Sequence, residues 1–141
     1  MRWLGILLCC VLLASCASNL TVNLESSRYL NPDANKQSLP VLVKVYQLTD
    51  DQIFKQASFD GLWLQPKQVL GRTFLSTQSI TIVPKATKSV SIKAAKGVNY
   101  VGFVAVFRTR DRSNWRVIKS VSWMSHRYDL RLRGNVLEVS R

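Results

Sequence analysis

From Leu20 onward, the chain alternates between hydrophobic and polar positions with a period of two over most of its length. Such alternation is typical of β-strands with one buried face, because successive side chains of a strand point to opposite sides. The alternating segments are short and are separated by polar residues or by Gly and Pro, as in an antiparallel sandwich or barrel. The hydrophobic positions of the clearest segments are Leu20, Val22 and Leu24; Val41, Val43 and Val45; Ile80 and Ile82; and Val90 and Ile92. We therefore predict an all-β fold, an antiparallel β-sandwich.

The end of the chain predicts a hairpin with a defined register. Gly134-Asn135 can form a two-residue turn with glycine at the first central position. In this register Leu132 faces Leu137, Leu130 faces Val139 and Arg131 faces Glu138. The first two pairs are apolar and belong to the buried face. The third joins opposite charges on the solvent-exposed face, where such pairs stabilise a sheet.

Two segments depart from simple alternation. Residues 49–52 have the spacing of a capping box, and Ile53, Phe54 and Ala57 then share one face of a helix. Asp60-Gly61 is expected to end this helix after about two turns. The second segment, residues 98–107, is apolar at both alternating positions, so a strand there must be covered on both faces.

The opposing sheet is expected to cover one face of that strand. The short helix and the stretch Leu62-Trp63-Leu64 are candidates to cover the other face.

A long segment, Ser26 to Pro40, separates the first two predicted strands. Its Asn31-Pro32-Asp33 sequence is typical of a turn, because proline presets its own dihedral angle and Asn and Asp bond nearby backbone. The segment is longer than a hairpin needs, and long ordered loops in small domains are often functional. A tolerated surface insertion would have the same appearance.

The start of the chain is not part of the sandwich. A single charge, Arg2, precedes an apolar run from Trp3 to Ala14, which has the length of a secretory signal and is too short to span a bilayer permanently. The end of this run and the two residues after it, Leu13-Ala14-Ser15-Cys16, resemble a bacterial lipobox. In a lipobox the cysteine sulfur receives a diacylglycerol before cleavage, and the freed amine is acylated afterwards. An ordinary signal peptide with a chance cysteine is the alternative.

The predicted organisation has three parts. Residues 1–15 form a lipoprotein signal peptide, residues 16–19 form a tether with its lipid on Cys16, and residues 20–141 form the sandwich domain. Three residues separate Cys16 from the first strand, a reach of about 10 Å at most, so the domain is held close to the membrane. Ala17 follows the cysteine where the enterobacterial signal for inner-membrane retention has aspartate, which is compatible with the outer membrane.

The cysteines and the histidine limit the chemistry of the mature chain. All three cysteines (Cys9, Cys10 and Cys16) precede the predicted domain, so no internal disulfide can form and the fold depends on its hydrophobic core. With no thiol left in the domain and His126 as the only histidine, we expect no structural metal site and no cofactor.

The net charge is +12, and arginine dominates the basic residues from Arg108 onward. In a cytosolic protein this charge would suggest nucleic acid. After a lipoprotein signal it favours anionic lipid headgroups or an acidic partner instead. We expect neither nucleic acid nor a small-molecule substrate as a partner.

A hydrolase is the main alternative from another class, because Ser125, His126 and Asp129 lie close together in the sequence. The chain has no nucleophile-elbow motif, however, and catalytic triads are defined by spatial geometry rather than by adjacency in sequence. A third possibility is another envelope lipoprotein, pilotin-like or glycan-binding, in which Trp63, Trp115 and Trp123 form a platform for sugars.

Several of these features occur together in a known family. The chain resembles the TssJ (VasD) family, the outer-membrane lipoproteins of type VI secretion systems. The resemblance rests on the lipobox, Leu30-Asn31-Pro32-Asp33, the strand from Pro40 to Leu48, Phe54 and Leu62, the strand from Tyr100 to Arg108, and Trp115-Arg116, in this order.

The resemblance implies a transthyretin-like β-sandwich with a short added helix and a non-enzymatic role. Such lipoproteins are lipid-anchored in the outer membrane, face the periplasm and bind the periplasmic domain of the IcmF-like protein TssM. In the family, the loop between the first two strands is a main contact with TssM. In this sequence that contact corresponds to Tyr29, Leu30, Asn31, Pro32 and Asp33.

Overall fold

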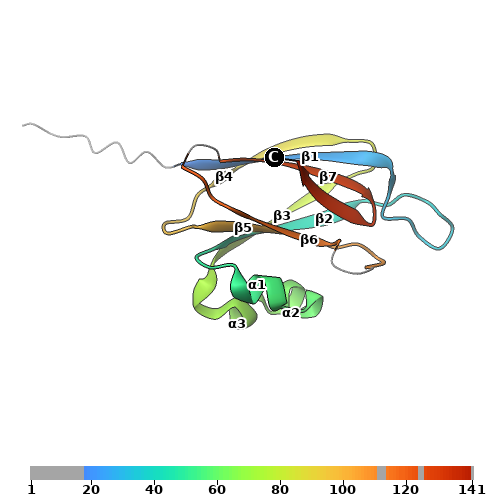
Figure 1. Ribbon diagram of the computed structural model, residues 1–141. Helices are drawn as coiled ribbons and strands as arrows, with labels where there is room; N and C mark the ends of the chain where they lie inside the picture. Colours follow the sequence, from blue (N-terminus) through green and yellow to red (C-terminus); the bar gives the residue numbers. More distant parts are fainter. Residues whose placement is uncertain (1–17, 111–113, 124–125, 141) are drawn as a thin grey trace, which may run out of the picture.

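The computed structural model describes residues 18–110, 114–123 and 126–140 of the chain. These residues form two four-stranded sheets packed face to face, with three short α-helices on the outer side of the second sheet (Figure 1). The first sheet has the order β4 (Thr87–Lys93), β1 (Asn19–Leu30), β7 (Arg127–Gly134), β8 (Val136–Ser140). The second has the order β3 (Phe74–Ile82), β2 (Val41–Leu48), β5 (Tyr100–Ala105), β6 (Arg116–Ser120).

The predicted all-β sandwich is confirmed, with one departure from antiparallel pairing. Strands β1 and β7 run parallel, whereas the other neighbouring pairs are antiparallel. A parallel pair needs a long crossover connection, and here most of the domain separates the two strands in sequence. The sequence pattern of either strand alone does not reveal this pairing.

The alternating hydrophobic positions form one core between the sheets. The Phe103 ring of β5 meets the Tyr128 ring of β7 across the sandwich, with centroids 5.6 Å apart. The same core buries Leu20, Val22, Leu24, Val43, Val45, Ile80, Ile82, Ile92, Val101, Leu130, Leu132 and Leu137. Because no disulfide can form in the domain, burial of this apolar surface is the main stabilising term.

The first strand is longer than its hydrophobic pattern indicated. Alternation predicted a strand near Leu20, with a loop starting at Ser26, but β1 continues to Leu30. The ladder with β7 shifts register between Ser26 and Leu30. The hydroxyl of Ser26 donates to the Val83 carbonyl (2.6 Å) and accepts from the Ala86 amide (2.9 Å), so a polar residue occupies a buried strand position. The loop between β1 and β2 therefore covers only residues 31–40.

The predicted hairpin is confirmed in its register. Leu132 faces Leu137 and Leu130 faces Val139, and Gly134 has φ +54°, the left-handed conformation that the turn requires. Arg131 also lies opposite Glu138, but this pair forms no ion pair. Glu138 binds Arg133 instead, because β1 on the other side of β7 offers a second carboxylate to Arg131.

The helical segment differs from its prediction. The first helix, α1 (Gln52–Gln56), ends after five residues, and its N-cap Asp51 makes no side-chain capping bond, so the capping box is absent. Asp60-Gly61 does not end a helix but lies inside α2 (Phe59–Leu64). Ser58 starts this second helix, because its hydroxyl accepts from the Gly61 amide at 3.0 Å. The layer continues with α3 (Pro66–Leu70) and a 3₁₀ turn at Gly71–Thr73.

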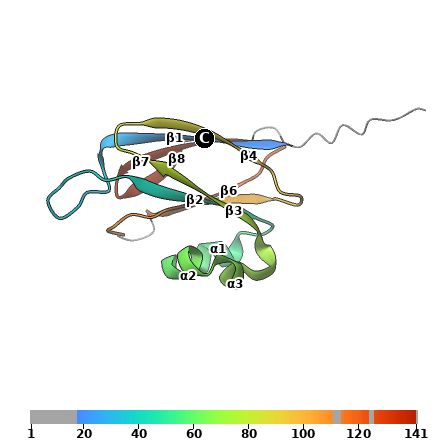
Figure 2. The same ribbon diagram turned by 180° about the vertical axis from the view of Figure 1, so that it is seen from behind.

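The helices cover the outer face of β5, as predicted (Figure 2). The buried Phe54 ring of α1 lies directly on Gly102, and the Tyr46 hydroxyl of β2 donates to the Leu62 carbonyl of α2 at 2.7 Å. Burial raises the pKa of this hydroxyl. Arg116 of β6 donates to the carbonyls of Phe54 and Ala57 and so holds the end of α1 on the sheet.

No helix in the described part of the chain is long and apolar enough to cross a membrane.

The contact between Phe54 and Gly102 generates a prediction about stability. A Cβ atom at position 102 would lie 2.6 Å from the Phe54 ring, closer than packing allows. Gly102→Ala is therefore expected to lower the free energy of unfolding by about 1–3 kcal/mol, measured by denaturant titration. Phe54→Leu provides the control, because it removes the clashing ring atoms. The loss of unfolding free energy in the double variant is expected to be smaller than the sum of the losses in the two single variants. Strictly additive losses would contradict the contact between Phe54 and position 102.

Candidate functional site

The first strand connects the two ends of the sandwich at which the sequence predicts the lipid anchor and the partner contact. Its first residue, Asn19, is the last residue of the predicted tether, so the strand begins one residue earlier than the sequence pattern indicated; its last residue, Leu30, leads into the loop at residues 31–40. The strand has 12 residues, and the steps of about 3.3 Å between them place its first and last Cα atoms roughly 36 Å apart. We call the end at Asn19 the tether end and the end at Leu30 the loop end. Figure 1 shows the start of β1 and the long loop on opposite sides of the molecule.

Cys16 lies outside the residues that the structure describes. Ser18, the first described residue, is exposed at the tether end, and its carbonyl accepts from the Ala94 amide at 2.9 Å. The structure therefore holds the chain at this end only two residues after the cysteine.

The loop at residues 31–40 is held at its base by backbone and serine contacts. Leu30 is fully buried, its carbonyl accepts from the Leu39 amide at 2.9 Å, and its amide donates to the Ser38 hydroxyl at 3.1 Å. The same hydroxyl donates to the Arg28 carbonyl at 2.7 Å. The two arms of the loop are thus joined next to the sheet.

Asn31 connects the loop to two other segments. Its side-chain amide donates to the Pro40 carbonyl at 3.0 Å, and its side-chain oxygen accepts from the Arg108 amide at 2.8 Å. Its own backbone amide donates to the Gly134 carbonyl at 2.8 Å. Asn31 has φ +44°, which asparagine tolerates better than most residues, and it is only 4% exposed. It therefore acts as a structural residue of the loop end.

Asp33 organises the tip of the loop. One oxygen of its carboxylate accepts from the amides of Asn35 (2.8 Å) and Gln37 (2.9 Å), and its own amide donates to the Gln37 carbonyl (2.9 Å). These bonds form the Asx-type turn that the Asn-Pro-Asp sequence predicted. Residues 34–37 consequently point their side chains into solvent.

The five predicted contact residues thus divide into two groups. Leu30 and Asn31 face inward and are buried, so in this conformation their side chains contact the protein itself. Pro32 and Asp33 are half-buried, and Tyr29 is 55% exposed. The Tyr29 ring lies beside Gly134 at the hairpin turn, since a Cβ atom there would be 3.7 Å from it. The loop end therefore presents one exposed aromatic residue beside an ordered polar loop.

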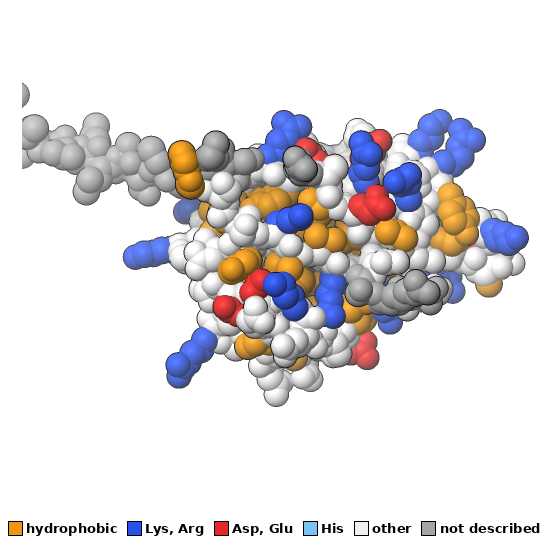
Figure 3. All heavy atoms as spheres, viewed as in Figure 1, with side chains coloured by type: hydrophobic (Ala, Val, Ile, Leu, Met, Phe, Trp, Pro, Cys, Tyr) orange, Lys and Arg blue, Asp and Glu red, His pale blue; other side chains and the backbone are white. Residues whose placement is uncertain are grey.

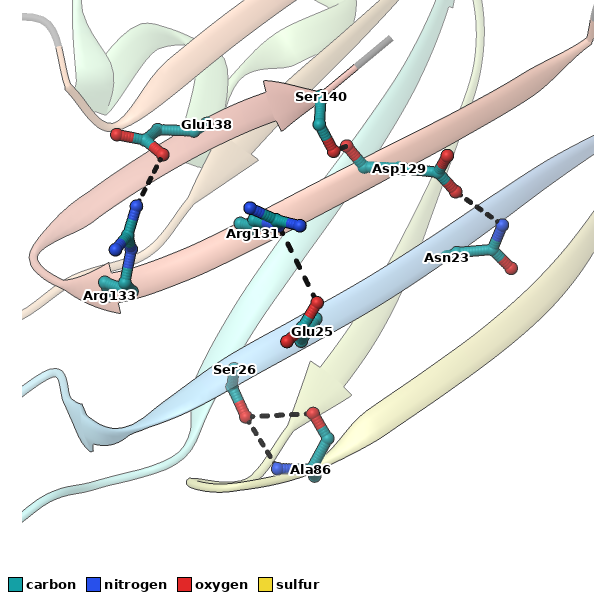
Figure 4. Close-up of polar contacts among 9 residues, drawn as sticks. All are labelled: Asn23, Glu25, Ser26, Ala86, Asp129, Arg131, Arg133, Glu138 and Ser140. Carbon is teal, nitrogen blue, oxygen red and sulfur yellow. Dashed lines mark hydrogen bonds and ion pairs between the residues drawn. The ribbon is translucent and has the colours of Figure 1, made fainter.

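The outer face of the first sheet is polar and charge-paired (Figure 4). Asn23 donates to Asp129 at 2.7 Å and accepts from the Ser89 hydroxyl at 2.7 Å. The bond from Asn23, aided by Arg127, holds the pKa of Asp129 below its usual value. Arg131 and Glu25, opposite each other in the parallel ladder, approach to 3.7 Å.

These ion pairs change the interpretation of the basic C-terminal third. The pairs are Arg127 with Asp129, Arg131 with Glu25 and Arg133 with Glu138. In each pair the carboxylate partly compensates an arginine charge for which the sequence alone shows no partner. The pairs are largely exposed, so each contributes little to stability.

Lys44 is a buried cation that the sequence analysis did not single out. It lies on the outer face of β2, with its ammonium group 5.5 Å from the centre of the Tyr46 ring and 5.2 Å from that of Trp63. Burial lowers its pKa. Its alternation with Val43 and Val45 is typical of an exposed strand residue, and only the helical layer buries it.

The catalytic alternative finds no support in the described residues. Ser125 lies outside them, His126 precedes β7 and Asp129 is bonded to Asn23 and Arg127. Among the described residues, no group of three His, Cys, Asp or Glu side chains could hold a metal ion.

The three tryptophans do not form one platform for sugars. Trp115 is buried at the start of the chain segment that enters β6, edge-on to Phe59, with ring centroids 5.2 Å apart. Trp123 follows the other end of β6 and is 90% exposed. Trp63 lies in the helical layer, near Lys44.

Solved structures share this fold. The chain superimposes on the crystal structure of the type VI secretion lipoprotein TssJ1 from Pseudomonas aeruginosa with a TM-score of 0.80 and 22% identity, covering 88% of this chain and 95% of that one. For Serratia marcescens Lip, a membrane-bound component of the type VI secretion system, the TM-score is 0.81 and the identity 21%, and the match covers 89% of this chain and 99% of that one. For a chain in a structure described as the T6SS protein TssM C-terminal domain from EAEC, the TM-score is 0.74 and the identity 19%, and the match covers 87% of this chain and 98% of that one.

The family is decided by a separate comparison. No curated protein sequence matches the chain. A family model described as type VI secretion lipoprotein, VasD, EvfM, TssJ, VC_A0113, matches residues 18–135, which is most of the chain. This match confirms the resemblance and the non-enzymatic class that it implies. The chain therefore belongs to the type VI secretion lipoprotein family.

Proposed function

We propose that this protein is an outer-membrane lipoprotein that anchors the type VI secretion membrane complex by binding the periplasmic domain of TssM. The observation that supports the proposal is the separation of the two ends of β1, because Asn19 and the loop at residues 31–40 lie on opposite sides of the domain. A member of this family is a non-enzymatic component of the membrane complex. The outer membrane, the lipid on Cys16 and the contact with TssM are our inferences.

The proposed anchor is the acylated Cys16. Burial of acyl chains contributes about 0.8 kcal/mol per methylene, so two or more chains give a stable attachment. The chain between Cys16 and the sandwich is short, and the Ser18 carbonyl is already bonded to Ala94. A force on the partner would therefore reach the membrane with little slack.

The proposed partner contact is the loop end. Tyr29 supplies an exposed aromatic side chain, the residue type that often carries much of the energy of an interface. The loop that follows it, with Pro32, Asp33 and the exposed residues 34–37, is held in a fixed arrangement by the bonds to Asp33. Leu30 and Asn31 serve the same contact indirectly, because they hold the loop in place from inside.

The proposed anchor generates a prediction about Cys16. Cys16→Ser in the full-length chain removes the acceptor of the lipid, so the protein is expected in the soluble periplasmic fraction or as an unprocessed precursor. Secretion is expected to fail, as measured by release of a secreted component of the system. Cys10→Ser is the matched control, because it alters a cysteine that leaves with the signal peptide. Intact membrane association together with intact secretion in Cys16→Ser would refute the anchor.

The proposed partner contact generates a prediction about Tyr29. Tyr29→Ser is expected to weaken binding to the periplasmic domain of TssM at least about tenfold, measured by titration calorimetry, while the melting temperature stays nearly unchanged. Trp123→Ser removes an exposed aromatic residue from the other end and is expected to leave this affinity unchanged. Wild-type affinity in Tyr29→Ser would show that the partner binds elsewhere.

A companion variant tests whether Leu30 stabilises the fold rather than contacting the partner. Leu30→Ala truncates a fully buried side chain and is expected to lower the free energy of unfolding by about 2–5 kcal/mol.

A further inference from the structure

The tether end of the sandwich combines a shallow hollow, exposed lysines and an exposed tryptophan, and attachment through a lipid on Cys16 requires none of these. Ser18, Lys93, Lys96, Val121 and His126 line one shallow hollow there. These residues come from the start of the described chain, from the end of β4 and the segment after it, and from the connection between β6 and β7. Figure 3 shows basic side chains projecting from the side of the molecule where β1 begins.

Trp123 lies beside this hollow. It is two residues after Val121 and three before His126, and both of these residues line the hollow. Trp123 is 90% exposed, the largest value among the exposed large hydrophobic residues of the described chain. An indole is apolar over most of its surface and has one N–H donor, and such side chains concentrate at the interface between a bilayer and water.

The charge at this end is basic. Lys93 and Lys96 are exposed, as is Lys119 at the end of β6, and these three take part in none of the ion pairs formed by the described residues. Asp50 is an exposed acid in this part of the fold, because Asn99 bonds the carbonyl of the preceding Thr49, and its carboxylate accepts from the Gln52 amide at 2.9 Å. In contrast, several arginines of the first sheet are paired with carboxylates.

We propose that the tether end docks directly onto a bilayer of anionic phospholipids, with Trp123 in the headgroup region and Lys93 and Lys96 at the phosphates. This inference rests on the acylation of Cys16 proposed above. Ser18 is two residues after Cys16, so their Cα atoms are at most about 7 Å apart. This reach is comparable with the Debye length of about 8 Å at physiological ionic strength, so lysines beside Ser18 lie near enough to the headgroups for electrostatic attraction.

A membrane fits this surface better than a protein partner does. The described chain begins at Ser18, which lines the hollow, so a lipid on Cys16 would hold the bilayer there continuously. Docking would also fix the orientation of the domain, with β1 directed away from the membrane and the loop end facing the periplasm. A lipid anchor alone leaves the domain free to rotate about its tether.

Fluorescence quenching in proteoliposomes tests the proposal. The acylated, full-length mature protein is reconstituted into vesicles of phosphatidylethanolamine, alone or mixed with phosphatidylglycerol, that carry bromine on the upper part of the acyl chains. Wild type and Trp63→Phe are expected to be quenched equally, because Trp63 lies in the helical layer. Trp123→Phe is expected to lose most of the quenching. Since Trp123 is almost fully exposed, this substitution leaves the fold intact.

A charge reversal tests the role of the lysines. Lys93→Glu with Lys96→Glu is expected to lower quenching in phosphatidylglycerol vesicles to the level seen with phosphatidylethanolamine alone. Lys36→Glu with Lys85→Glu makes the same change of charge at exposed positions of the loop end and is expected to have no effect. An equal effect of the two double variants would show that only net charge matters and would refute the surface.

Vesicle flotation and the mass of the N-terminal peptide distinguish the two proposals. A protein that carries acyl groups and floats with the vesicles, yet shows the same quenching in Trp123→Phe as in wild type, refutes docking and leaves the anchor intact. A protein that carries no acyl groups and does not float refutes the anchor, and docking with it.

Discussion

The hydrogen-bond ladders that hold β1 between β4 and β7 are the constraint on which the rest of this molecule depends. One strand runs from the tether end to the loop end, so a force between the proposed membrane anchor and the proposed partner contact would pass along it. Both edges of β1 are paired over much of its length, so such a force loads many backbone hydrogen bonds together rather than one after another. A domain without disulfides can in this way act as a mechanical link.

The second sheet and its helical layer support this link from the side. Phe54 seated on Gly102, and Tyr46 bonded to the Leu62 carbonyl, bury the outer face of β5 and let an apolar strand lie between two layers. Arg116 ties the end of α1 to the sheet. The helices are each too short to be stable alone, so packing against the sheet maintains them.

The distribution of charge and of aromatic side chains gives the two ends different surfaces. The loop end presents Tyr29 beside a polar loop that Asn31 and Asp33 hold in shape. The tether end presents Trp123 beside exposed lysines. Between them, the outer face of the first sheet is occupied by paired charges, so its arginines are a poor guide to where an anionic partner binds.

The sequence by itself determined most of the strands, the hairpin register at Gly134 and the turn at Asp33, because alternation and turn chemistry act between neighbours in the chain. The motif that predicts lipid on Cys16 is equally local. Only the tertiary structure decided that β1 continues through Ser26, that Asn31 faces inward, and that Glu25 meets Arg131. These outcomes depend on β7, on Arg108 and on the hairpin, which lie far away in sequence, and local periodicity carries no information about such distant partners.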